Sequence, residues 1–184
     1  MSGAPVVPAT RAEAVQLGLA RGRRLDQALA ALGYQTEHGE LEGARLAARV
    51  YDAAQDKHPP EELDWWVWAL DTLARPAELL ADKERREARL HEIRATVRPA
   101  DPLELLCQLA LGNAAYQLGE GLYVGELAAL ARITAPAVFK AIKLGRLTPR
   151  TGTPLRVSWT SARDYLKERS DREAWALSRT KVAP

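Results

Sequence analysis

The chain has 184 residues, 47% hydrophobic and 27% charged, which is typical of a globular protein of one or two domains. No apolar run approaches the roughly 18 residues that a membrane-spanning helix needs, and the start lacks the pattern of a secretory signal, so we expect a cytoplasmic protein that does not bind membranes. The single cysteine, Cys107, excludes an intrachain disulfide and a cysteine-based zinc site, and no metal or other cofactor is predicted.

Residues 1–9 contain two prolines and no helical period, so we expect a loose tail there. A helix is predicted over residues 10–33, where apolar residues recur at helical spacing. Thr10 and Glu13 have the spacing of a capping box, in which side chains satisfy the free N–H groups at the start of a helix. Gly33 is expected to end this helix.

This helix contains two glycines and a cluster of three arginines. Gly18 and Gly22 are predicted weak points, because glycine has a low helix propensity. Arg21, Arg23 and Arg24 form a small basic cluster, which we interpret as a solvated face, with phosphate contact as the alternative.

A second helix, over residues 41–54, has an alanine-rich face, and a third follows over residues 60–70 with three tryptophans. Trp65 and Trp68 face one way and Trp66 faces another, so this helix is predicted to have two buried sides. The second side is covered either by another helix of the same chain or by a second subunit. Stacking on nucleic-acid bases is a third option, which the acidic residues around the tryptophans disfavour.

Residues 76–97 form a charge-rich helix with a thin apolar stripe, read as either an exposed spanning helix or a short coiled-coil arm. Asp101 is a predicted N-cap, followed by a proline at the first helical position. The helix that it opens, residues 102–118, is apolar nearly all round and is predicted to be the central buried helix, with Cys107 as a core residue. Residues 119–121 break the chain.

Residues 122–147 read as two short helices joined by a tight turn. The first is predicted over residues 125–132, and the second starts after Thr134, whose hydroxyl is placed to cap it. Lys140 and Lys143 share the face of the second helix opposite its apolar residues, a pattern typical of a DNA-reading helix. Gly145 is expected to end that helix in the left-handed conformation.

Two extended runs, residues 147–149 and 155–159, surround a turn rich in proline, glycine and threonine and predict a β-hairpin wing. Thr160 or Ser161 then caps a third helix. Phe139 is expected to pack against this helix or the wing, with DNA contact as the alternative.

The segments YVGELAALARIT, PAVFKAIKLGRL and PLRVSWTSARDYLKER resemble, in this order, the winged helix-turn-helix of excisionase-type and MerR-like DNA-binding proteins. The resemblance covers about residues 122–170, and Arg132 stands where many members have glycine. It implies DNA contact by the recognition helix, the residue after it and the wing. The residues in question are Thr134, Ala135, Lys140, Lys143, Arg146, Arg150 and Arg156.

The charge distribution agrees with a DNA-binding module. Residues 122–184 carry 12 Lys+Arg against 5 Asp+Glu, a balance of +7, whereas residues 1–121 carry 14 against 19, a balance of −5. The asymmetry indicates a basic nucleic-acid module on an acidic helical partner.

The sequence therefore predicts a mainly α protein with a helical domain over residues 10–118, a winged helix-turn-helix over residues 122–170, and a helical extension or tail over residues 171–184. We expect sequence-specific binding to double-stranded DNA in a bacterial nucleoid, as a transcriptional regulator or as an accessory factor in excision, plasmid or phage maintenance. The alternative is a protein interaction module that uses the tryptophan-rich domain.

A homodimer is expected, because one small reading head makes few base contacts. Its predicted interface is the Trp65 and Trp68 side of the third helix, together with the stripe from Leu79 to Val97. The head alone, residues 119–184, is expected to fold and to bind DNA weakly as a monomer. We expect no enzymatic activity, because the histidines are isolated in sequence and no catalytic or nucleotide-binding motif is present.

Overall fold

The structure is a computed structural model that describes residues 6–31, 38–56, 60–75, 82–99 and 101–180, with only the backbone described for residues 171–180. Within these residues the chain forms eight helices and one small antiparallel sheet, so the predicted mainly α class is confirmed. The elements are α1 (Arg11–Ala31), α2 (Gly39–Gln55), α3 (Leu63–Thr72), α4 (Lys83–Ala95), α5 (Pro102–Gln117), β1 (Leu122–Tyr123), α6 (Val124–Leu130), α7 (Ala135–Lys143), β2 (Pro149–Arg150), β3 (Arg156–Val157) and α8 (Trp159–Thr180).

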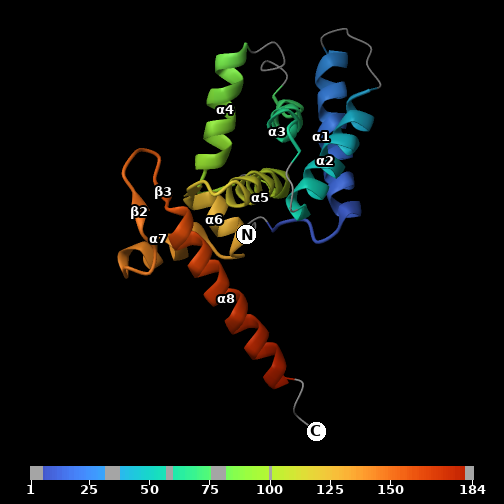
Figure 1. The fold of residues 1–184 in the computed structure, drawn as a ribbon. Helices are drawn as coiled ribbons and strands as arrows, with labels where there is room; N and C mark the ends of the chain where they lie inside the picture. The colour runs from blue at the N-terminus through green and yellow to red at the C-terminus, as the bar shows by residue number, and fades with distance from the viewer. Residues whose placement is uncertain (1–5, 32–37, 57–59, 76–81, 100, 181–184) are drawn as a thin grey trace.

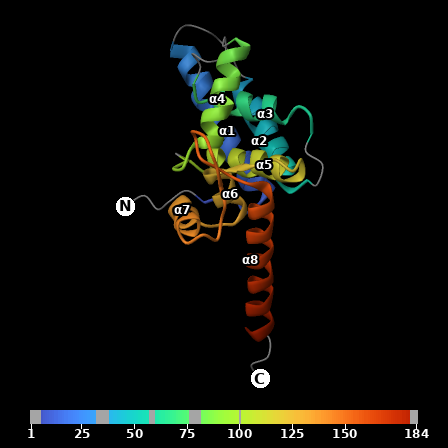
Figure 2. The ribbon, with the colours of Figure 1, turned by 60° about the vertical axis from the view of Figure 1, so that its left-hand side comes forward.

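Helix α5 is the centre of the fold, as predicted, and packs against α1, α2, α3, α4 and α6 (Figure 1). Asp101 caps it by accepting hydrogen bonds from the N–H groups of Leu103 at 2.9 Å and Glu104 at 3.0 Å. Helices α1 to α4 lie on one side of α5, while α6, α7 and the sheet lie on the other. Helix α8 extends away from the body in both views (Figures 1 and 2).

The glycines of α1, which the sequence predicted as weak points of the helix, are the contact points of a close helix crossing. A Cβ atom on Gly18 would lie 2.2 Å from the carbonyl oxygen of Gly43 in α2, and one on Gly22 would lie 1.9 Å from that of Gly39. The two helices therefore meet backbone to backbone, which only glycine permits at this distance.

Arg21 is buried in the helical part, which corrects its assignment to a solvated face. Its guanidinium pairs with Asp101 and donates a hydrogen bond to the carbonyl oxygen of Leu70 at 3.3 Å. Burial alone would raise the pKa of Asp101, but Arg21 and the capping N–H groups outweigh it and hold that pKa below its ordinary value. Arg23 remains exposed and pairs on the surface with Glu40 of α2 at 2.7 Å, so Arg21 is the buried member of the cluster.

Helix α4 begins at Lys83, after the N-cap Asp82, and the predicted start at Pro76 lies outside the described residues. It is not a free arm, because Ile93 is buried and Arg89 makes a two-pronged ion pair with Asp71 of α3, at 2.8 and 3.0 Å. The hydrogen bonds that Arg89 donates to the Asp71 carboxylate outweigh desolvation and raise the pKa of Arg89 above its ordinary value.

The apolar interior divides into two clusters that meet along α5. The first joins α1 to α5 and contains Cys107, where burial raises the pKa of the thiol to about 12. The second joins the end of α5 to α6, α7, the sheet and the start of α8. No helix among the described residues is long and apolar enough to cross a membrane.

The sheet has three strands in the order β1, β3, β2, one more than the two predicted. Both pairings are antiparallel, with Leu122 opposite Val157 and Arg150 opposite Arg156. Strand β1 was missed because two buried residues directly before a helix carry no alternation. By pairing with β3, β1 joins the β2–β3 hairpin to the segment that follows α5.

Candidate nucleic-acid interface

Helices α6 and α7 occupy the two predicted helical segments, with small shifts at their ends. Thr134 is the N-cap residue of α7, but its side chain makes no capping hydrogen bond, so the predicted hydroxyl cap was wrong. Its carbonyl oxygen accepts from the N–H of Ala137 at 2.9 Å instead. Gly145 has φ +71° and ends the helix in the left-handed conformation, as predicted.

The turn between the two helices contains Arg132 with φ +51°, in the left-handed region that favours glycine. This is the position where the resemblance expects glycine. The backbone closes by a 2.9 Å hydrogen bond from the N–H of Ile133 to the carbonyl oxygen of Ala128. Arg169 of α8 donates to the carbonyl oxygen of Ala131 at 2.7 Å, so α8 also supports the turn.

The outward face of α7 consists of Pro136, Phe139, Lys140 and Lys143, all exposed. Phe139 is 42% exposed and does not belong to the apolar cluster of this part of the chain, which corrects the expectation that it packs against α8 or the hairpin. Ala135 is buried, so its side chain is not available to DNA, which corrects the contact implied by the resemblance.

The segment that contains this face is positively charged. Between Glu126 and Asp164 the sequence has seven arginines and lysines and no acidic residue. Among the described residues, no carboxylate pairs with Lys140, Lys143 or Arg150, and these side chains are exposed. A polyanion would therefore meet uncompensated positive charge here.

Glu126, the one carboxylate of α6 and α7, is turned away from this face and is 0% exposed. It accepts hydrogen bonds from Arg94 of α4 at 2.6 Å and from the N–H of Tyr123 at 2.9 Å. Burial raises the pKa of Glu126 above its ordinary value despite Arg94. A Cβ atom on Gly125 would lie 2.3 Å from the carbonyl oxygen of Thr96, so α6 is seated closely against the end of α4.

Tyr123 connects α4 to the β2–β3 hairpin. The guanidinium of Arg94 lies 5.2 Å from the centre of its ring and that of Arg156 lies 4.2 Å from it. The Tyr123 hydroxyl also hydrogen-bonds to Nδ1 of His91 at 2.8 Å and accepts from Arg156. Arg156 is therefore engaged within the protein, and His91, although isolated in sequence, has a partner in Tyr123.

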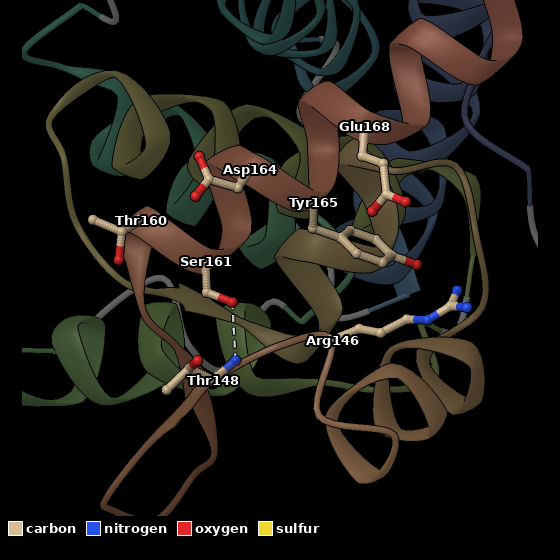
Figure 3. A pocket seen from close by; sticks show the side chains of 7 residues that line it. All are labelled: Arg146, Thr148, Thr160, Ser161, Asp164, Tyr165 and Glu168. Carbon is tan, nitrogen blue, oxygen red and sulfur yellow. Dashed lines mark hydrogen bonds between the residues drawn. The ribbon is translucent and has the colours of Figure 1, made fainter.

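A hollow of about 330 Å³ lies between the segment after α7 and the first turns of α8 (Figure 3). Arg146 lines it together with the carboxylates Asp164 and Glu168, so this hollow carries charges of both signs. Ser161 accepts a hydrogen bond from the N–H of Thr148 at 2.9 Å rather than capping α8. Thr160, the other predicted cap, lies inside the helix, which begins at Trp159.

The predicted tryptophan interface is only partly on the surface. Trp65 is 51% exposed, but Trp68 is 5% exposed, which corrects its assignment to a dimer contact. The two rings lie 4.9 Å apart, and Arg86 of α4 lies over both, at 5.9 Å from the centre of Trp65 and 5.4 Å from that of Trp68. Of the stripe from Leu79 to Val97, Leu79 lies outside the described residues, Ile93 is buried and Val97 is exposed.

Across the part of the chain that the structure describes, no group of three or more histidine, cysteine or acidic side chains could hold a metal ion. A comparison of the chain with known protein families, with curated proteins and with solved structures finds no match.

Proposed function

We propose that the protein binds double-stranded DNA sequence-specifically, with α6 and α7 as a helix-turn-helix, α7 as its recognition helix and the β2–β3 hairpin as a wing. The observation that carries this proposal is the outward face of α7. Lys140 and Lys143 are exposed there without acidic partners, while the only carboxylate of the two helices, Glu126, is buried on the opposite side.

The size and charge of this face suit duplex DNA. The major groove, about 12 Å wide, admits one α-helix, and its walls are lined by phosphates. Lysine side chains on the outward face reach those phosphates or guanine edges. Arg150 in the hairpin adds a second point of contact beside the helix, and Thr134 and Arg132 are exposed at the turn. The contacts of Glu126 and Tyr123 hold α6 and the hairpin against α4.

A role in transcription regulation, or in excision, plasmid or phage maintenance, is part of this proposal, as is a homodimer that presents two reading heads to paired half-sites. Trp65 is the described tryptophan that remains exposed for such an interface. The rival function, a protein interaction module centred on the tryptophans, loses support from the burial of Trp68.

The experiment is a salt titration of binding to a random-sequence duplex pool and to the duplexes selected from it. DNA binding through several cations weakens steeply as salt rises, because condensed counterions are released. Lys140→Ala with Lys143→Ala should reduce the slope of log Kd against log salt by about 2 if both lysines meet phosphates. The matched control, Arg24→Ala with Arg85→Ala, removes two exposed cations from α1 and α4 and should leave the slope unchanged.

Circular dichroism should show unchanged helicity in both double variants, because all four side chains are exposed. Absence of duplex binding by the intact protein, or equal losses in the two double variants, would contradict the proposal. If one lysine reads guanine, its single substitution should lose about 1–3 kcal/mol on the selected duplex and less on a scrambled one.

A further inference from the structure

We infer that Phe139 contacts the C5-methyl group of a thymine in the major groove and is a specificity-determining residue of the DNA site. This inference rests on the proposed function and adds to it the base feature that α7 reads. Its starting point is the exposure of the only phenylalanine in the chain, at 42%, on the outward face of α7.

An exposed apolar residue by itself means little, since single ones are common on protein surfaces. Phe139 differs because of its neighbours. It shares the outward face with Pro136, Lys140 and Lys143, while the opposite face holds the buried residues Val138 and Ala141. The apolar patch formed by Phe139 and Pro136 is therefore flanked by two cations without acidic partners, and its charge surroundings favour a polyanion over an apolar protein surface.

The chemistry of the groove selects the thymine methyl as the partner. Lysine side chains are long enough to reach the phosphates on the groove walls, but a phenyl ring gains nothing from a phosphate. Phe139 is the fifth of the nine residues of α7, at the middle of the helix. If α7 lies in the groove, this position faces the base edges, where the methyl group of thymine is the one apolar feature.

The test uses the intact protein and duplexes selected from a random pool. The selected duplex is remade with each thymine in turn replaced by deoxyuridine, which lacks only the methyl group. At one position the replacement should weaken binding about fourfold, because one buried methyl group contributes roughly 0.8 kcal/mol. Phe139→Ala should weaken binding to the thymine duplex at least fourfold. This variant should bind the thymine and uracil duplexes with equal affinity, because the methyl group no longer has a partner.

Leu144→Ala is the matched control, because Leu144 is a 61% exposed apolar residue at the C-cap of α7, beyond its last turn. It should leave the thymine preference unchanged. Phe139→Ala should also leave the salt slope unchanged, unlike the lysine variants, since it removes no counterion-releasing contact. Urea unfolding of both variants confirms that the fold is intact.

The outcomes separate the inference from the proposed function. If the protein binds duplex DNA with a steep salt dependence but no uracil replacement affects it, or the selected sites lack thymine, the inference is overturned and the proposed function stands. If Phe139→Ala abolishes self-association in light scattering and leaves the thymine preference intact, Phe139 belongs to a protein interface and the inference is overturned. If no duplex binds, both fail.

Discussion

Replacing Gly22 with alanine should destabilise the protein, although alanine is the better helix former. The added Cβ atom would lie 1.9 Å from the carbonyl oxygen of Gly39 and 2.7 Å from the Cα atom of Glu40. Both are backbone atoms that no rotamer change can move, so α1 and α2 must separate. Overpacking of this kind costs about 3 kcal/mol at the upper end of its usual range. The higher helix propensity of alanine returns about 1 kcal/mol, so the net loss is about 2 kcal/mol.

Urea unfolding followed by circular dichroism measures this change. In a thermal scan, a loss of about 2 kcal/mol lowers the Tm by roughly 4–8 °C in a chain of this size. Ala20→Gly, at an exposed position of the same helix, isolates the propensity effect and should cost only about 1 kcal/mol. A Gly22→Ala variant as stable as the wild type or more stable would refute the backbone-to-backbone crossing, because only the clash opposes the propensity gain.

Four further experiments test the interior, the turn between α6 and α7, and the unity of the fold. Asp101→Asn keeps an N-cap but leaves Arg21 without its counter-charge, and should cost about 1–2 kcal/mol at pH 7, less than a fully buried pair because Asp101 is partly exposed. The pKa of Asp101 is lowered in the folded state, so the ion pair stabilises the protein above the unfolded pKa of about 3.9, and this stabilisation is lost as pH falls through the folded pKa. The difference in free energy of unfolding between Asp101→Asn and the wild type, measured in urea, should therefore shrink below about pH 4 and not above it. Arg132→Gly should raise the free energy of unfolding by about 0.5–1 kcal/mol by relieving the positive φ, and an equal loss would contradict the left-handed turn. Cys107 should react with a maleimide only after unfolding, because its thiol is buried and has a raised pKa; rapid labelling of the native protein would contradict its place in the core. Residues 119–184 alone should lack a cooperative thermal transition, contrary to the expectation from sequence, because Glu126 and its neighbours would lose the surfaces of α4 and α5 that bury them; a cooperative transition would restore that expectation.

The sequence was informative wherever the deciding interactions are local. Asp101 followed by a proline predicted the start of α5, and Gly145 predicted the end of α7, because caps act within one turn of the helix that they end. The apolar period placed Val138 and Ala141 inside and Lys140 and Lys143 outside. The two lysines of the candidate interface could therefore be placed before any tertiary contact was known.

Phe139 and Ala135 mark the limit of such reasoning at the interface. Phe139 stands at the border between the inward and outward faces of α7, and helical spacing does not say how wide the buried face is. Ala135 stands three residues before the buried Val138, so spacing alone places it on the inward face, against the contact that the resemblance implied. The packing of α7 against α6 and the hairpin decides that width, and it buries Ala135 while leaving Phe139 exposed. The structure thus buries the residue for which the resemblance implied DNA contact and exposes the one that was expected to pack.

By itself, the sequence determined the mainly α class, the central helix and the basic outward face of α7, since each depends on spacing within one element. Only the tertiary structure decided which charged and small residues are internal. Arg94 and Glu126 are separated by 32 positions, and Gly22 meets Gly39 across two helices. A periodic pattern describes the faces of one helix, but the element that packs against each face depends on how the rest of the chain folds back onto that helix. Tertiary packing of this kind produces the inward position of Glu126, the contacts of Tyr123 and the close glycine crossing.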